Sequence, residues 1–188
     1  MAVAALLARI TAHGPALIRM PPGGVPELTG EDIALALAQA PARSVWLLRA
    51  KYMDDLTGLA RLESALYQRA VPIAEGWRGW SVDDTDSRRL LGSLCRAAIV
   101  EVMDPALCRT CQGRGHVLSG GLLKNCTPCH GSGRGRRKEA ERARLVGVQY
   151  DAWRKTWSTR LDRLTGIVEG WESAGLGAIA AVVYGEVA

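Results

Sequence analysis

Four cysteines arranged as two C-x2-C pairs constrain this chain more than any other feature. The first pair is Cys108 and Cys111, the second is Cys126 and Cys129, and 14 residues separate the pairs. A C-x2-C turn places two thiolates on one side of a tight loop, and two such turns supply the four sulfurs that tetrahedral zinc prefers. The spacing therefore predicts one structural zinc ion, with these four cysteines as its ligands.

Each cysteine pair continues into two glycines in the same arrangement, which gives two C-x2-C-x-G-x-G units. The glycines are Gly113 and Gly115 in the first unit and Gly131 and Gly133 in the second. A chain that wraps a metal ion turns sharply, and glycine tolerates the positive φ that such turns often need. The repeated glycines therefore favour a metal-binding loop over four unrelated cysteines.

Two other uses of these cysteines deserve consideration, disulfide bonding and redox chemistry. Residues 1–12 do not resemble a secretory signal, because Arg9 interrupts the apolar run and no positive leader precedes it. Clustered cysteines in an intracellular chain favour metal over disulfides. We therefore expect a cytoplasmic protein that binds zinc. Cys95 lies apart from the cluster in an apolar helical stretch, where a small buried thiol is the expected role.

Two histidines lie close enough in sequence to compete as metal ligands, His116 and His130. His130 directly follows Cys129 and is expected to be a solvated neighbour. A closed site of four sulfurs leaves no coordination position for a substrate, so the metal should be structural.

Length and composition indicate a folded and mainly helical protein. The chain has 188 residues, of which 48% are hydrophobic, so it can bury a sizeable core and is not disordered. Its longest uncharged runs are shorter than the roughly 18 residues that span a bilayer, which predicts a soluble protein with no membrane association.

The pattern of apolar residues divides the chain into three parts. Residues 1–105 read as a helical body, residues 106–135 as an inserted zinc-binding module, and residues 136–188 as a C-terminal helical part. Within the body, apolar spacing and helix-starting residues predict an apolar segment at 1–11, a helix at 30–39 capped by Thr29 and ended by Pro41, a buried helix at 45–52, a helix at 56–71 that ends before a connector containing Pro72 and residues 76–79, and a helix that starts at 83–86 and ends before Pro105.

The zinc-binding module carries the only strand signal. Two short apolar segments, Val117-Leu118 and Leu122-Leu123, flank the glycine-rich turn Ser119-Gly120-Gly121. Such a pattern predicts a β-hairpin between the two cysteine pairs.

Positive charge gathers in and after the zinc module. Residues 1–105 carry 11 Lys or Arg and 12 Asp or Glu, whereas residues 106–188 carry 13 and 7, so the whole net charge of +5 comes from the second part. The charge concentrates in a basic run just beyond the second cysteine pair, which comprises Arg134, Arg136, Arg137, Lys138, Arg142 and Arg144. An isolated run of this kind is as often a solvated face as a binding site.

The segment after the basic run has the framework of a helix-turn-helix. Ala143 is small where two helices would cross, Gly147 lies at the turn, and Val146, Val148 and Trp153 would pin the second helix. Thr156 occupies a position that is usually apolar, and an ordinary pair of packed helices is the alternative. The neighbouring basic run and zinc module favour the DNA-binding interpretation.

A helix-turn-helix here would begin its second helix near residue 149 and direct polar side chains outward. Gln and Arg can make bidentate contacts to base edges, and Lys suits phosphates. Asp151, which also faces outward, would oppose indiscriminate phosphate binding. The predicted DNA contacts are Arg134, Arg136, Arg137, Lys138, Arg142, Gln149, Tyr150, Arg154, Lys155 and Ser158. Trp153, Trp157 and Trp171 lie at helical spacing and are expected in a core or a protein interface.

An enzymatic function finds no support in the sequence. The chain has three histidines and lacks the H-E-x-x-H, phosphate-binding-loop and nucleophile-elbow motifs. Acidic residues at 54–55 and 83–86 precede helices, where carboxylates usually serve as caps. We therefore expect neither catalysis nor a small-molecule substrate.

These residues together resemble two known families. The paired cysteine and glycine units look like half of a DnaJ-type zinc domain, but that likeness stops at residues 108–133, and no His-Pro-Asp of a J-domain is present. The chain as a whole is more similar to bacteriophage late-gene antitermination proteins of the Q class. That resemblance covers roughly residues 85–180 and includes residues 150–161, Trp171 and Glu172.

The Q-class resemblance implies a specific function. Such proteins bind double-stranded DNA near a late promoter, load onto bacterial RNA polymerase paused there with its sigma factor, and let it read through terminators. The four cysteines match the family's zinc ligands, and the apolar and acidic N-terminal body is a candidate for the polymerase contact. The alternative is a DnaJ-like zinc module that binds proteins in a chaperone or adaptor role, with the basic run only a solvated face.

Overall fold

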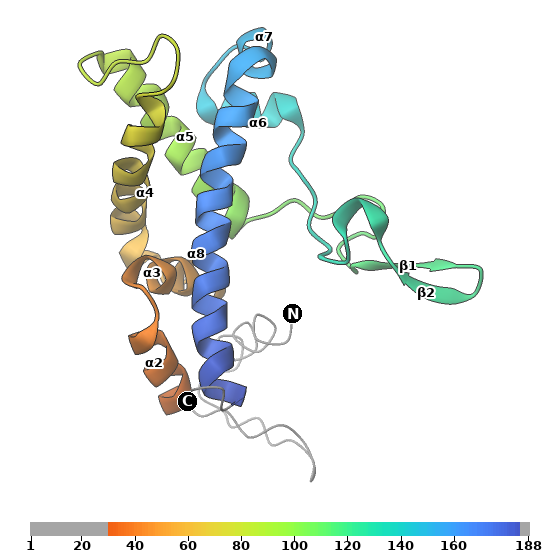
Figure 1. Ribbon diagram of the computed structural model, residues 1–188. Helices are drawn as coiled ribbons and strands as arrows, with labels where there is room; N and C mark the ends of the chain where they lie inside the picture. The colour runs from red at the N-terminus through yellow and green to blue at the C-terminus, as the bar shows by residue number, and fades with distance from the viewer. Residues whose placement is uncertain (1–29, 185–188) are drawn as a thin grey trace. The chain divides into compact units, whose positions relative to one another are not determined.

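The structure, a computed structural model, describes residues 30–184, which form mainly α-helices and one small antiparallel sheet (Figure 1). The apolar segment predicted for residues 1–11 and the predicted cap Thr29 lie outside the described residues. None of the described helices is long and apolar enough to cross a membrane.

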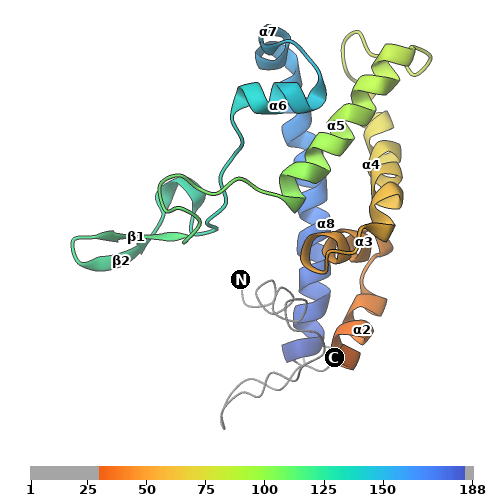
Figure 2. The same cartoon turned by 180° about the vertical axis from the view of Figure 1, so that it is seen from behind.

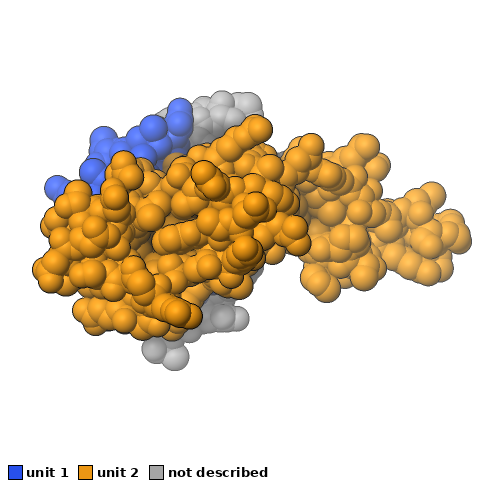
Figure 3. All heavy atoms as spheres, turned by 90° about the horizontal axis from the view of Figure 1, so that it is seen from above, with its two compact units in different colours: residues 1–68, 166–188 blue, residues 69–165 orange. Residues whose placement is uncertain are grey.

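Two compact units divide the chain, one formed by residues 1–68 and 166–188 and the other by residues 69–165 (Figure 3). The division falls within helices α4 (Leu59–Ala74) and α8 (Ser158–Tyr184). It cuts across the three parts expected at 1–105, 106–135 and 136–188, whose boundaries stay a prediction.

The first unit contains helices α2 (Gly30–Gln39), α3 (Ala42–Tyr52), a 3-10 turn (Leu56–Gly58) and the C-terminal part of α8. Ala36, Leu48 and Ile179 form its buried cluster. Helices α3 and α8 approach closely, because a Cβ at Gly175 would lie 2.6 Å from the side chain of Leu48. The predicted helix at 30–39 and its end before Pro41 are confirmed.

A buried ion pair also links α3 to α8 in this unit. The ammonium of Lys51 lies 2.7 Å from the carboxylate of Glu172, and both side chains are 5% exposed. The hydroxyl of Tyr52 donates a second hydrogen bond to the same carboxylate. Glu172 therefore has a structural role here.

The second unit contains helix α5 (Thr85–Met103), the hairpin β1 (His116–Ser119) and β2 (Leu122–Asn125), helix α6 (Glu139–Val146) and the helical segment α7 (Tyr150–Ala152). Asp84 caps α5 by accepting a hydrogen bond from the N–H of Ser87, as expected for a carboxylate before a helix. Cys95 is 1% exposed on α5, which confirms the expected buried thiol.

Chain geometry around the hairpin follows directly from its glycines. The strands pair antiparallel with Ser119 opposite Leu122, so Gly120 and Gly121 form a two-residue turn (Figure 2). Both turn residues have positive φ, 62° and 78°, which is the backbone that a type I′ turn requires and that glycine adopts most easily. The predicted hairpin is confirmed, and it contains the only strands among residues 30–184.

Helix α4 extends beyond the predicted segment 56–71, and the helical segment that begins at residue 150 joins α8. Helix α4 passes through Pro72 to Ala74, because a proline in the last turn sacrifices only one backbone hydrogen bond. Segment α7 continues without a break through a π-helical turn (Trp153–Trp157) into α8, so the helix that starts at Tyr150 runs to Tyr184.

Candidate metal centre

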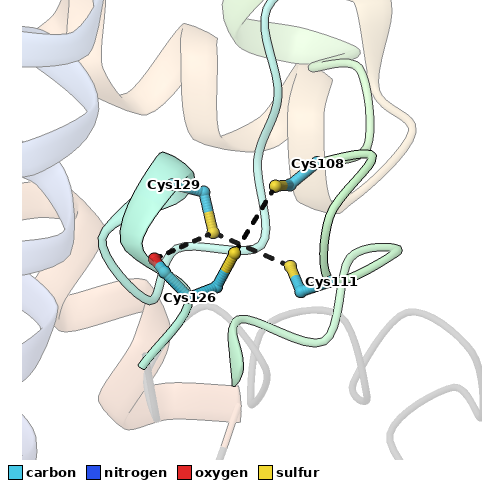
Figure 4. A group of neighbouring side chains, drawn as sticks. All are labelled: Cys108, Cys111, Cys126 and Cys129. Atoms are coloured by element: carbon cyan, nitrogen blue, oxygen red, sulfur yellow. Dashed lines mark hydrogen bonds between the residues drawn. The ribbon is translucent and has the colours of Figure 1, made fainter. Parts of the chain in front are cut away.

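The four predicted zinc ligands converge on one point. Their sulfurs all lie within 4.8 Å of one another, and all four cysteines are buried. In Figure 4 the side chains of Cys108 and Cys111, which precede β1, face those of Cys126 and Cys129, which follow β2. This group can hold a metal ion.

Sulfur spacing and donor chemistry fit tetrahedral coordination. The Sγ atoms of Cys108 and Cys126 are 3.8 Å apart, and those of Cys111 and Cys129 are 3.7 Å apart. Zinc–sulfur bonds of about 2.3 Å would place tetrahedral ligands about 3.8 Å from each other. Two sulfur pairs therefore already have the tetrahedral separation, and all sulfurs lie within 4.8 Å of one another. None of the five cysteines forms a disulfide bond.

The backbone around the site repeats itself. The N–H of Cys108 donates to the carbonyl of Gly133 (2.9 Å), and the N–H of Cys126 donates to the carbonyl of Gly115 (2.8 Å). Each unit therefore binds the far end of the other. This exchange holds the two cysteine turns face to face without any help from side chains.

Glycines permit the two units to approach this closely. A Cβ on Gly115 would lie under 3.0 Å from the carbonyl oxygen of Gly131, and a Cβ on Gly133 would lie under 3.0 Å from that of Gly113. All four glycines also have positive φ. The sequence predicted that these glycines would serve tight turns. The structure adds a second reason, because Gly115 and Gly133 leave room for the carbonyls of the other C-x2-C-x-G-x-G unit.

Local hydrogen bonds and burial act differently on the thiols. The backbone N–H of Cys111 lowers the pKa of Cys108 to about 6, whereas burial raises the pKa of Cys126 to about 12. The sulfur of Cys111 accepts a hydrogen bond from the N–H of Gly115 (3.2 Å). A bound cation is what would hold all four as thiolates, because coordination deprotonates a thiol outright.

Neither histidine belongs to the group. Among the described residues, the cluster of metal-binding side chains consists of the four cysteines alone. His130 is exposed and takes a left-handed conformation (φ 50°) directly after Cys129. His116 lies on β1 and is half-buried.

Part of the basic run is neutralised by carboxylates. Arg136 lies 2.7 Å from Asp162, and Arg137 lies 2.7 Å from Asp104 and 2.6 Å from Glu141. The side chain of Arg137 is only 17% exposed. The partners Asp104 and Asp162 could not be found by inspecting the sequence, because they lie 33 and 26 residues away, whereas Arg137 and Glu141 have the i,i+4 spacing of a helix-surface pair.

Arg142 does not have the surface position that the DNA-binding prediction requires. Its side chain is 1% exposed and lies 2.5 Å from Glu101 on α5 and 2.5 Å from Asp162 on α8. Its guanidinium also stacks on Trp153, 5.3 Å from the ring centroid. This arginine therefore ties α6 to α5 and α8 and is corrected to a structural residue.

Most of the other predicted DNA contacts are exposed. They are Arg134, Arg136, Lys138, Gln149, Tyr150, Arg154 and Lys155, whereas Ser158 is half-buried. Arg144, the last basic residue of α6, is exposed as well. Helix α6 ends at Val146 with Gly147 (φ 81°) as its cap, and the next helical segment begins at Tyr150. Arg144, Gln149, Tyr150, Arg154 and Lys155 therefore lie on and around the turn between two helices, whereas Arg134, Arg136 and Lys138 precede α6.

Two features of this unit were not found by sequence reasoning. The guanidinium of Arg160 lies 4.6 Å from the ring of Trp77 and 4.5 Å from that of Trp157, a pairing that spans more than 80 residues of sequence and left no local signal. Three leucines of the hairpin, which we call the hairpin leucines, are exposed: Leu118, Leu122 and Leu123. The sequence offered a signal for their exposure. Residues 106–135, which we call the metal module, contain little apolar core against which such short strands could bury leucines.

Comparison with known proteins leaves the family open. The chain matches no protein-family model, and no curated protein sequence matches it.

Proposed function

We propose that the cysteine cluster binds one zinc ion with a structural role. Support comes from the donor set, since four sulfurs at tetrahedral spacing suit zinc and leave no position for a substrate. Zinc would close the loop between residues 108 and 129 and fix the start of the chain that leads into α6.

We further propose that the protein is a phage transcription antiterminator of the Q class. In this function it binds DNA near a late promoter and modifies RNA polymerase, together with its sigma factor, so that the enzyme reads through terminators. The setting is the cytoplasm of a bacterial host, and the role is binding, with no catalysis. Sequence resemblance supplies the specific function, and one structural observation supports DNA binding.

That observation is the exposed polar group that follows the metal module. Lys138, Arg144, Arg154 and Lys155 are exposed, and within residues 30–184 none of them has an ion-pair partner. Phosphate contacts need cations without an ion-pair partner, and here such cations lie on and around a helix, a turn and a second helix. Gln149 and Tyr150, exposed at the start of the second helical segment, would then face the bases, and Arg136 would contribute once its carboxylate pairs yield to phosphate.

The test is a gel shift with the purified protein on DNA that surrounds its own gene. We expect one fragment to be retained, with an affinity that falls steeply as salt rises, by a slope of about 0.9 for each neutralised phosphate. Chelation of zinc should abolish the retention. Retention of every fragment alike, or of none, would contradict site-specific DNA binding.

One double variant and one single variant sharpen this experiment. Arg154→Ala with Lys155→Ala should weaken binding to the retained fragment and lower the salt slope by about 2, because two phosphate contacts are lost. Arg89→Ala, at an exposed arginine of α5 (72% exposed), serves as the matched control and should leave the slope unchanged.

A further inference from the structure

The hairpin leucines are among the most exposed apolar side chains of the described structure. Leu118 is 76% exposed, Leu122 66% and Leu123 65%, whereas exposed apolar side chains outside the metal module, such as Leu35, reach 55% at most. Burial of a leucine side chain stabilises a folded protein, so leaving three of them in water forgoes that stabilisation. Clustered exposure of this kind marks interaction sites.

Folding of the metal module does not use these leucines. The buried cluster around the four cysteines contacts one partly buried apolar residue of the hairpin, Val117. Strand β2 is exposed along its whole length. The leucines are therefore free to serve a partner without weakening the metal site.

Strand register places the leucines on both faces of the hairpin. Leu118 is directly opposite Leu123, so their side chains form a cross-strand pair on one face. Leu122 is opposite Ser119 on the other face. The turn itself is Gly120-Gly121, so the leucines lie behind the tip and not at it.

Basic residues surround the hairpin in the sequence. Residues 106–138 contain no Asp or Glu and seven basic residues, which are Arg109, Arg114, Lys124, Arg134, Arg136, Arg137 and Lys138. Arg136 and Arg137 already pair with carboxylates from elsewhere in the chain, so the positive charge offered to a partner comes from exposed residues such as Arg109, Arg114 and Lys124. Lys124 follows Leu123 on β2 and lies on the same face of the hairpin as Leu122. A complementary partner must therefore combine an apolar patch with acidic side chains.

We propose that the β1–β2 hairpin is a docking surface for a protein that presents an apolar patch bordered by carboxylates. Duplex DNA, the other acidic partner, fits less well. Proteins that kink DNA insert a large apolar side chain between stacked base pairs, whereas the tip of this hairpin consists of two glycines. The inference rests on the proposed function for one point, that RNA polymerase carries this patch.

A model peptide tests the surface chemistry independently of polymerase. The probe is a fluorescein-labelled amphipathic helix made of leucine and glutamate, and its matched control replaces every glutamate by lysine. We expect the full-length zinc-loaded protein to bind the glutamate peptide at least tenfold more tightly in fluorescence anisotropy. Equal affinity for the two peptides, or none for either, would overturn the proposal.

Variants then locate the binding. Leu118→Ser with Leu123→Ser removes the cross-strand pair and should weaken peptide binding at least tenfold, with one zinc still bound per chain. Lys124→Glu should weaken it as well, through repulsion of the carboxylates. Leu56→Ser with Val82→Ser, at two exposed apolar residues elsewhere (53% and 48%), is the control and should have no effect. If the control variant alone lost affinity for the glutamate peptide, the binding site would lie elsewhere and the proposal would be overturned.

Purified RNA polymerase holoenzyme and the DNA fragment complete the experiment. If the leucine variant loses polymerase binding but retains the DNA fragment, the hairpin is the polymerase contact. If the variant loses the peptide but the wild type does not bind polymerase, the surface stands and the proposed antitermination function fails. If the variant loses DNA binding while peptide and polymerase affinities are unchanged, the hairpin contacts DNA and the proposal is overturned.

Discussion

Glycine residues between Cys108 and Gly133 serve two separable purposes. Gly120 in the hairpin turn needs only a positive φ, since a Cβ there would meet nothing within 4 Å. Gly115 needs a positive φ and also the absence of a side chain, because the carbonyl of Gly131 occupies that space. The comparison isolates close packing of the two units from backbone strain.

Substituting these two glycines by alanine should therefore give unequal losses of zinc affinity. Strain at positive φ costs about 1–2 kcal/mol, so Gly120→Ala should lower zinc affinity by no more than about 30-fold. Gly115→Ala adds the clash and should lower it at least a further tenfold. Competition with a chromophoric chelator measures both affinities, and equal losses would contradict the interlocking of the units.

Arg142 is the residue whose role changed most between sequence and structure. Its partner Glu101 has a side chain only 10% exposed, so removing the arginine leaves a nearly buried carboxylate unpaired. Arg142→Met should therefore lower the free energy of unfolding by about 3 kcal/mol in urea denaturation. Arg136→Ala removes an exposed arginine from the same Asp162 and should cost under about 1 kcal/mol. Similar losses in the two variants would refute the structural role.

One cluster of charged and aromatic side chains attaches helix α6 to its neighbours. The indole N–H of Trp153 donates to the carboxylate of Glu139 at the start of α6, and Arg142 lies one turn further along. Trp153 is fully buried and opens the π-helical turn. A π-helical turn often accompanies a functional constraint, and here it lets Trp153 reach this cluster while Arg154 and Lys155 stay exposed.

Acid should weaken this attachment through Glu139. Burial raises the pKa of Glu139, but the hydrogen bond from Trp153 and the charges of Arg136 and Arg142 outweigh it, so the pKa lies below its usual 4.5. A carboxylate with a lowered folded-state pKa stabilises the protein above about pH 4.5, and this stability is lost as pH falls through the folded-state pKa. Glu139→Gln lacks the titrating group.

Urea denaturation of both proteins between about pH 6 and pH 3 checks this prediction. The wild type should exceed Glu139→Gln in stability at the upper end, and the difference should shrink as the pH falls. A difference that stays constant over the whole range would show that Glu139 acts only through its shape.

Local signals in the sequence predicted whole elements well. The acidic residues at 83–86 and Pro105 bracket α5, and the double glycine at 120–121 gives the hairpin and its register. Long-range ion pairs were not predictable, because Arg142 meets Glu101 across 41 residues and looks like any other member of a basic run. The cluster of four cysteines was predictable residue by residue, because two C-x2-C pairs are the spacing that tetrahedral metal coordination requires.

The whole molecule combines two kinds of stability. Residues 30–68 and 166–184 bury apolar side chains such as Leu48 and Ile179 between helices, as ordinary helical proteins do. The stretch from residue 106 to residue 135 has four cysteines and one partly buried valine as its core. Such a small apolar core cannot order a chain by itself, so under the proposed zinc binding the metal would supply most of the folding free energy of this stretch.

Loss of the metal should consequently unfold one part of the chain and spare the rest. We expect chelation, or Cys126→Ser, to remove the hydrogen-exchange protection of residues 116–125, whose pairing depends on the cysteine turns at either end. Amides in the middle of α5 and in residues 158–165 of α8 should keep their protection, because side chains of these segments pack on apolar residues and on the Arg142 cluster. Cys95→Ser, at a buried cysteine outside the cluster, should bind zinc like the wild type and keep the hairpin protected.

Hydrogen exchange followed by mass spectrometry resolves these segments in one experiment. An unchanged exchange pattern in the hairpin after chelation would show that the metal is not what folds it, and simultaneous loss of protection in α5 and α8 would show that the metal stabilises the whole second unit.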